Sequence, residues 1–293
     1  MAKETLKQIS RDRVMPKGID RQFRKDVAPY ILKYKSEPHT PELINETWQG
    51  FWGALGKSVG FEYIVPQCKF TKEEIAGIER KHRAVLLLPD DIFKPEGLGK
   101  LCKVFPVRMR GASDQKELSK IFNSSGEGGC VVTEMQLFAP NMIAGGYDQF
   151  GLTKKIEFDG GVGQRLATYI VASKFCQLVM RGHQFDEHEI WSRIIGSTYE
   201  GEALAASSDS NGYIELRRCP PNKQSSNLGG RSEFKTEFWK DFSDPEGFSG
   251  LKSHNEVSYF WKYFPNPDSP EDREKRRYIW TSISLGGKGS IKE

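Results

Sequence analysis

Residues Glu189–Lys235 read EIWSRIIGSTYEGEALAASSDSNGYIELRRCPPNKQSSNLGGRSEFK, and this stretch decides how the rest of the chain is interpreted. It contains two predicted strands, Ala203–Ser207 and Tyr213–Arg217, separated by a polar turn at Ser210–Gly212. Gly212 can supply the positive φ that a tight hairpin turn needs. The stretch therefore predicts a small antiparallel hairpin.

The second predicted strand alternates apolar and polar residues. Ile214 and Leu216 fall on one side, and Tyr213, Glu215 and Arg217 fall on the other. Because side chains alternate across a strand, this pattern predicts one face packed against a core and one face in solvent. A hairpin that binds a ligand and a solvated hairpin that binds nothing would both show it.

The composition is that of an ordinary globular protein. Of the 293 residues, 37% are hydrophobic and 28% are charged, which allows one large core or two modest ones. The net charge of +4 is mildly basic and spread along the chain, so a dedicated nucleic-acid-binding surface is not expected. No apolar run is long enough to cross a bilayer, and the N-terminus lacks the apolar segment of a secretion signal. We therefore expect synthesis in the cytoplasm and no membrane span.

No motif predicts a metal ion, a cofactor or a catalytic group. The five cysteines show no CxxC spacing, which favours buried free thiols over a zinc site. His183 and His188 would lie on different sides of a helix, so a polar loop is predicted around them and the neighbouring Asp186 and Glu187. The glycine-rich segments lack the spacing of a phosphate loop or a dinucleotide-binding turn. Without a GxSxG motif or an activated thiol, a protein that is not an enzyme is predicted.

Helix and strand signals alternate through the N-terminal half. Helical spacing or a capping pattern predicts helices at residues 21–33, 43–56, 71–83 and 165–180. Short apolar runs predict strands at residues 61–65, 84–88, 103–108, 130–138 and, near the end, 278–283. The many aromatic residues after residue 236 predict a C-terminal segment that packs on the body.

The order of features between residues 165 and 232 resembles a known fold. A helix starting RLATYI at residue 165 is followed by FDE at 185, WSR at 191, GS at 196, Gly212 and LGGRS at 228. This order resembles the C-type-lectin fold, and in particular the variable proteins of diversity-generating retroelements, which belong with the formylglycine-generating-enzyme-like branch of that fold. The long segment after Ser232 departs from the pattern, because the variable region of such proteins often lies close to the C-terminus.

The resemblance implies a fixed framework and a displayed surface. The framework would consist of Trp191, Arg193, Gly196, Gly212, Gly229 and Arg231. The displayed, ligand-binding positions would be Tyr199, Glu200, Glu202, Ala205, Ser207, Asp209, Asn211, Tyr213, Glu215, Arg217, Asn222, Lys223, Gln224 and Ser226. Calcium-dependent sugar binding is not implied, because the EPN and WND triplets of sugar-binding lectins are missing.

These observations together predict an α+β chain with three parts. They are an N-terminal α/β region at 1–115, a C-type-lectin-like domain at 116–236, and an aromatic-rich C-terminal segment at 237–293. The predicted function is non-enzymatic recognition of a protein or cell-surface ligand, without metal or cofactor. The alternative is a cytoplasmic nucleic-acid-associated or hydrolytic protein that acts through two short basic clusters, at residues 11–13 and 273–277, and its aromatic C-terminal segment.

Overall fold

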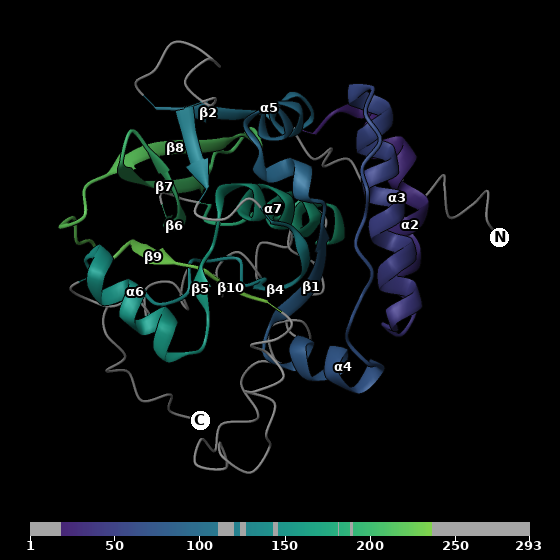
Figure 1. The fold of residues 1–293 in the computed structure, drawn as a ribbon, viewed down its shortest axis with the longest axis horizontal. Coiled ribbons are helices and arrows are strands. Elements are labelled where there is room, and N and C mark those ends of the chain that lie inside the picture. Colours follow the sequence, from purple (N-terminus) through teal and green to yellow (C-terminus); the bar gives the residue numbers. More distant parts are fainter. Residues whose placement is uncertain are drawn as a thin grey trace, which may run out of the picture.

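Two β-sheets and a central helix organise the part of the chain that the structure describes. The structure is a computed structural model, and it describes residues 19–110, 120–123, 127–142, 146–180, 182–187 and 190–235. Helices and strands both contribute to these residues, which confirms the predicted α+β class. Figure 1 shows the central helix α7 among the strands and the helix pair α2 and α3 along one side.

The first sheet joins strands from distant parts of the sequence. It has the order β1–β4–β10–β5, and every pairing in it is antiparallel. The strands are β1 (Arg83–Leu88), β4 (Gly129–Glu134), β10 (Ser232–Lys235) and β5 (Val162–Gly163). Almost every residue of β1 and β4 is buried, including the polar Thr133 and Glu134 at the end of β4.

The second sheet contains the predicted hairpin. Its order is β2–β8–β7–β6–β3, and β9 pairs with β6 as well. The pairings β2–β8 and β6–β9 are parallel, and the other three are antiparallel. The strands are β2 (Val107–Met109), β3 (Ile121–Asn123), β6 (Trp191–Tyr199), β7 (Glu202–Ser208), β8 (Ile214–Cys219) and β9 (Leu228–Gly230).

The central helix α7 (Leu166–Val179) is buried on all sides. Every residue from Leu166 to Gln177 is buried, although Lys174 and Gln177 are polar. A helix enclosed on every side must be apolar around most of its circumference, and the sequence LATYIVASKFCQLV meets this requirement. The predicted helix at 165–180 is confirmed, and its residues join the largest hydrophobic cluster of the molecule.

The helices α2 (Arg21–Ser36) and α3 (Pro41–Val59) form an outer layer beside β1. The aromatic stripe of α3 faces inward, where Trp48 and Trp52 donate their indole N–H groups to the carbonyls of Val85 (3.0 Å) and Leu87 (2.6 Å). These bonds satisfy the polar ends of two buried indoles and fix α3 on the strand. The residues Trp48, Phe51, Trp52 and Leu55, which helical spacing places on one face, are all buried in the core.

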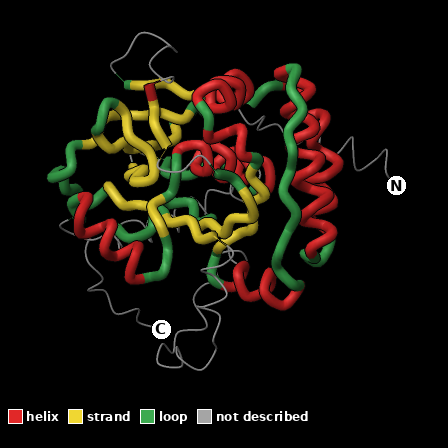
Figure 2. Tube along the Cα trace, in the orientation of Figure 1, coloured by secondary structure: helices red, strands yellow, loops and turns green. Residues whose placement is uncertain are grey.

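Shorter helices complete the layers that Figure 2 colours red around the yellow strands. They are α4 (Lys72–Arg80), a 3-10 turn at Asp90–Phe93, α5 (Pro95–Val104) and α6 (Gln149–Phe158). The predicted capping box of α4 is present, since the Thr71 hydroxyl accepts from the Glu74 N–H while the Glu74 carboxylate accepts from the Thr71 N–H.

Several predicted elements are wrong in type or length. Residues 61–65 join neither sheet. Their composition favours a strand, but among the described residues no strand pairs with them. The predicted strand at 103–108 starts inside α5, and the one at 130–138 ends at Glu134. Strand β6 and helix α6 were not predicted. The predicted strand at 278–283 and the whole segment 237–293 lie outside the described residues.

The predicted domain boundary at residue 115 does not separate two cores. Strand β1 from the first predicted part pairs with β4 from the second, and β2 pairs with β8 in the same way. One hydrophobic cluster extends from Phe23 to Phe234. The two predicted parts are therefore built into one another, because each sheet takes strands from both.

Candidate functional site

The predicted hairpin is present and its turn is well fixed. Strands β7 and β8 pair from Ala203 with Cys219 to Ser208 with Ile214. At the turn, the Asp209 carboxylate accepts the N–H groups of Asn211 (2.8 Å) and Tyr213 (2.9 Å). Gly212 has φ +83°, a left-handed conformation that favours glycine. The turn at Ser210–Gly212 that the sequence predicted is therefore confirmed.

The alternation predicted for β8 is confirmed. Ile214 and Leu216 are fully buried, whereas Tyr213, Glu215 and Arg217 keep part of their surface in solvent. Burying two large aliphatic side chains stabilises the fold by roughly 1.5–3 kcal/mol each. The hairpin is thus held from its inner face.

Three residues predicted to be displayed are in fact buried: Tyr199, Ala205 and Ser207. Ala205 packs in a small apolar cluster with Trp191, Cys219 and Leu228. The Ser207 hydroxyl donates to the backbone carbonyl of Asp186 (2.7 Å). The prediction failed for Ala205 and Ser207 because chain segments from outside the hairpin pack against them. Tyr199 lies in β6, where the Arg218 guanidinium is 4.7 Å from the centre of its ring.

The loop that follows β8, Pro220–Asn227, is called the display loop. Arg193 of β6 binds the backbone of the loop. Its Nη1 donates to the Pro220 carbonyl (3.2 Å), and its Nη2 donates to the Lys223 carbonyl (2.6 Å). Backbone bonds at its ends join Gln149 N–H to the Pro221 carbonyl (2.8 Å) and Trp191 N–H to the Asn227 carbonyl (2.9 Å). The loop is therefore anchored at several points through its backbone.

The side chains of the display loop point outward. Four of the predicted displayed residues lie here and all are exposed: Asn222, Lys223, Gln224 and Ser226. Because the anchoring bonds use backbone carbonyls of the loop, the identity of these side chains does not enter them. The loop combines a fixed path with free side chains.

The other predicted displayed residues lie at the hairpin ends, and most already have partners. Glu200 and Glu202 face Arg218, with N–O distances of 2.7 and 4.0 Å. The guanidinium of Arg108 lies 3.6 Å from the centre of the Tyr213 ring and 4.0 Å from Asp209. Asn211 is exposed at the turn. Surface ion pairs of this kind contribute about 0–1 kcal/mol.

A cluster of basic residues lies between the display loop and β8. The Arg217 guanidinium stacks on Trp191 at 3.8 Å from the ring centre. Burial is the main cause that lowers the pKa of Arg217, and the charges of Arg110 and Arg193 lower it further, while Cys219 opposes them. Arg217 forms no ion pair within the part of the chain that the structure describes.

The charges of these basic residues also affect the pKa of the Cys219 thiol, which lies among them. Burial raises the pKa of Cys219, and Arg193, Arg217 and Lys223 work against that rise. Burial lowers the pKa of Arg193, with Cys219 and Asp148 opposing. Like charges are thus gathered at the edge of the display loop, which attracts a negatively charged group. Of these residues, Arg110 was not foreseen from the sequence.

The framework residues predicted from the resemblance are all buried: Trp191, Arg193, Gly196, Gly212, Gly229 and Arg231. Gly196 and Gly229 sit where backbone approaches closely, since an added Cβ would lie 2.4 Å from the carbonyl oxygens of Gly163 and Pro140 respectively. Any larger residue would force these segments apart.

Arg231 and Asp186 form a polar centre that is fully buried. Arg231 donates through Nη2 to Asp186 Oδ1 (2.9 Å) and through Nε to Ser192 Oγ (3.1 Å), and its guanidinium stacks 3.9 Å from the centre of the Phe185 ring. The Tyr169 hydroxyl donates to Asp186 Oδ2 (3.0 Å). Burial acts to lower the pKa of Arg231, but the Asp186 charge outweighs it and the net change is a rise.

Residues 182–187 form a loop, as predicted, but this centre shows that part of the loop is buried. Asp186 is fully buried and paired with Arg231, 45 residues later in the chain. His188 lies outside the described residues. Among the residues that the structure describes, no group of three His, Cys, Asp or Glu side chains is placed to hold a metal ion.

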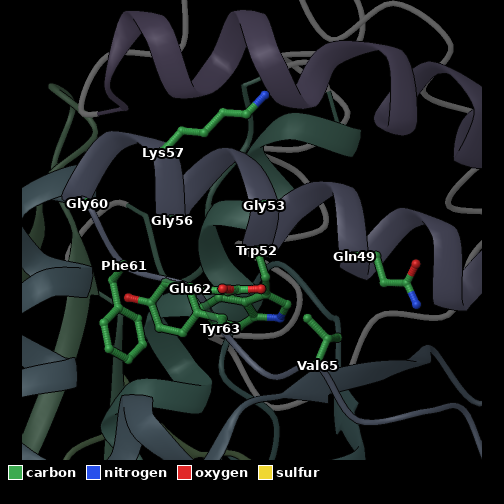
Figure 3. Close-up of a pocket in the computed structure, with 10 residues that line it drawn as sticks. All are labelled: Gln49, Trp52, Gly53, Gly56, Lys57, Gly60, Phe61, Glu62, Tyr63 and Val65. Atoms are coloured by element: carbon green, nitrogen blue, oxygen red, sulfur yellow. The ribbon is translucent and has the colours of Figure 1, made fainter.

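A separate hollow of ≈ 640 Å³ lies at the C-terminal end of α3. Figure 3 shows the rings of Trp52, Phe61 and Tyr63 together below this helix, with the Lys57 side chain extending away from them. Gly53 of α3 also lines the hollow, and an added Cβ there would meet nothing within 4 Å. Sequence reasoning missed this feature, because the wall at 61–65 was assigned to a strand.

Comparisons of the chain with protein-family models, with curated proteins and with solved structures found no match. Within the described ranges, no helix is both long enough and apolar enough to cross a membrane.

Proposed function

We propose that this protein is a non-enzymatic recognition protein that binds a protein or cell-surface ligand through the display loop and the adjoining edge of β8. The lectin-like resemblance suggests the same use. The observation that carries the proposal is the anchoring of the loop by Arg193: its backbone is fixed by hydrogen bonds while Asn222, Lys223, Gln224 and Ser226 stay exposed.

The arrangement suits a surface whose chemistry can change. The apolar inner face of the hairpin and the enclosed Arg231 centre supply stability away from the loop. Substitutions at the exposed loop positions remove no hydrogen bond of the anchors, so they are expected to cost within about 0.5 kcal/mol each. Exposed asparagine and serine with a nearby arginine are residue types that binding surfaces use for adaptable polar contacts.

The charge of the surface indicates the chemistry of the ligand. Arg110 and Arg217 repel each other, and Arg217 and Lys223 both act on Cys219, so an acidic group that binds at this edge would relieve the repulsion between the two arginines. The ligand is therefore expected to present carboxylates, or another anionic group, at this point of contact.

The division between loop and framework is tested with two libraries of the same size. One randomises Asn222, Lys223, Gln224 and Ser226, and the other randomises Trp191, Arg193, Gly229 and Arg231. Most loop variants should remain folded by thermal melting and protease resistance, whereas most framework variants should not. If the loop library unfolds as often as the framework library, the proposal is wrong.

The charge of the ligand is tested with poly-L-glutamate as a probe. The wild type should bind it, and Arg217→Gln with Lys223→Gln should bind much more weakly. Arg218→Gln is the matched control, because Arg218 is already paired with Glu200 and its loss should change binding little. Equal loss in the control, or no binding by the wild type, would contradict the assignment.

A nucleic acid is the alternative ligand that the same basic residues would attract. Binding of mixed DNA and RNA should be weak and should not exceed binding of poly-L-glutamate at equal ionic strength. Tight binding of nucleic acid that falls steeply with salt would favour the alternative function instead.

A further inference from the structure

The loop between α2 and α3 places His39 against the end of α4. The Nε2 atom of His39 lies 2.7 Å from the backbone carbonyl oxygen of Tyr34, near the end of α2. Its Nδ1 atom is hydrogen bonded to the carboxylate of Glu79, in the last turn of α4. Figure 1 shows α4 close to one end of the outer helix pair, α2 and α3. The imidazole ring therefore joins α4 to this pair.

Both ring nitrogens of His39 face hydrogen-bond acceptors, and this decides the charge of the ring. The carbonyl oxygen of Tyr34 and the carboxylate of Glu79 each accept a hydrogen bond, and neither donates one. A neutral imidazole carries one N–H group, so it can donate to only one of the two, whereas an imidazolium carries two N–H groups. The arrangement in the structure therefore requires that His39 is protonated.

The surroundings of the ring favour this charge. The ring stacks on that of Tyr34, with 4.0 Å between the ring centres, and Tyr34 packs edge-on against Phe175 of α7. Burial lowers the pKa of His39, but the bonds to Glu79 and to the Tyr34 carbonyl outweigh it, and the net change is a rise. Burial, and then the charge of Glu79, raise the pKa of the Tyr34 phenol, so this group stays neutral while His39 titrates.

The helix that His39 holds is short. An isolated helix of fewer than roughly 12 residues is not stable in water, so α4, with nine residues, depends on its contacts with the rest of the molecule. Ile75 and Ile78 are the buried residues of α4, and Glu79 adds the bond to His39. The side chains of His39 and Glu79 are 21% and 35% exposed, so protons can exchange between this pair and solvent.

We propose that protonation of His39 controls how tightly α4 is attached to the outer helix pair. When the proton leaves to solvent, one ring nitrogen presents a lone pair to an acceptor oxygen, that hydrogen bond is lost, and α4 loosens. Because the folded protein binds this proton more tightly than the unfolded chain, the stabilisation is complete below about pH 6.5 and is lost as pH rises through the raised pKa of His39. The proposal concerns a different part of the molecule from the display loop and stands independently of it.

The charge of the ring is tested by NMR titration of the imidazole signals of the full-length protein. The signals of His39 and His82 are those that are missing in His39→Gln and His82→Gln. The midpoint of His39 should lie above about 6.5, whereas that of His82, whose pKa is lowered by burial, should lie below it. Glu79→Gln should lower the midpoint of His39 by roughly one pH unit. Glu46→Gln is the matched control, because it removes a carboxylate that pairs with Lys33 on the same helices, and it should leave this midpoint unchanged.

The loosening of α4 is tested by hydrogen exchange at pH 6 and pH 8.5, corrected for the intrinsic effect of pH on amide exchange. Protection of the α4 amides should fall by roughly ten-fold in the wild type and in Glu46→Gln, since a tenfold change corresponds to about one unit between the unfolded and folded pKa values of His39. In Glu79→Gln it should change much less. The proposal is overturned if His39 of the wild type titrates at or below about 6.5, or if its α4 protection does not fall between the two pH values. Both measurements use the wild type, so they hold whether or not a variant folds.

Discussion

Arg231 and Arg193 are both fully buried arginines, and their hydrogen-bond partners are of different kinds. Arg231 meets a carboxylate, Asp186, which is itself held by Tyr169. Arg193 meets backbone carbonyls of the display loop, and its nearest basic neighbours repel it. The charges of Arg231 and Asp186 compensate each other, whereas the charge of Arg193 adds to the positive charge near the surface.

The difference separates stability from recognition. A buried ion pair is costly to break because the surviving partner keeps its charge without compensation. An arginine that donates to backbone carbonyls holds a chain segment without depending on the side chains of that segment. A molecule built in this way can vary its loop side chains while its enclosed centre stays constant, and the two regions should respond differently to substitution.

The largest effect is expected from Asp186→Asn. Asp186 has φ +54°, and asparagine tolerates this left-handed conformation, so the change removes charge without adding backbone strain. The buried Arg231 is left uncompensated, and the free energy of unfolding should fall by roughly 3–5 kcal/mol. Urea titration gives the value. Glu200→Gln, in the exposed pair with Arg218, is the control and should cost about 0–1 kcal/mol; a similar loss in both variants would contradict the comparison.

A third buried cation, Lys174, should make stability depend on pH. Its ammonium donates to the carbonyl of Gly212 (2.5 Å) and to Gln184 Oε1 (3.1 Å), and Asp209 is the charged group that acts on it. Burial lowers its pKa from 10.5 to about 7. Between these values the unfolded chain holds a proton that the folded chain lacks, so stability rises with pH, by up to about 1.4 kcal/mol per pH unit.

The measurement is the free energy of unfolding of the wild type and of Lys174→Met from pH 7.5 to 8.5. The difference between them should grow in favour of the wild type as pH rises. Comparing the two cancels the thiols, among which Cys68 titrates near 7 in both proteins. A difference that is constant across the window would show that Lys174 keeps its proton.

A smaller and more local effect is expected from Arg193→Met. The substitution removes the bonds to the carbonyls of Pro220 and Lys223, so it should cost about 1–3 kcal/mol. Hydrogen exchange should become faster at the Trp191 and Lys223 amides, whose bonds close the ends of the display loop. Exchange in α7 should not change. Loss of protection throughout α7 would mean that Arg193 supports the core and not the loop.

Sequence reasoning found the parts of the fold that local chemistry determines. The capping box correctly predicted the start of α4, the apolar spacing predicted α3 and α7, and the Asn211–Gly212 turn predicted the hairpin. Each of these signals lies within a few residues of its own effect. The alternation in β8 belongs to the same class, because it reports directly which side chains face the core.

The rest depended on contacts between distant residues. The segment 61–65 has the composition of a strand, but no neighbouring strand pairs with it in the described structure. Strand β6 was hidden because Arg193 interrupts its apolar run, and the carbonyls that satisfy it come from the display loop. Tyr199, Ala205 and Ser207 were predicted to be displayed, because contacts such as those of Ala205 with Leu228 and of Ser207 with Asp186 join distant parts of the sequence. Nothing in the sequence near Asp186 or Arg231 indicates that these two side chains form an ion pair.

The smallest effect, and the one that most directly separates the two regions, is expected from Arg217→Gln. Removing this charge relieves its repulsion with Arg110 and Arg193, and glutamine keeps part of the contact with Trp191. Stability at low ionic strength should therefore stay the same or rise by a few tenths of a kcal/mol, up to about 0.5. Thermal melting at 10 and 200 mM salt measures it, and the gain should shrink as salt screens the repulsion. Arg218→Gln, which gives up the pair with Glu200, should change in the opposite direction. If Arg217→Gln instead lowers stability by more than Arg218→Gln, the charge is already compensated inside the protein, and the basic cluster has no need of an acidic ligand.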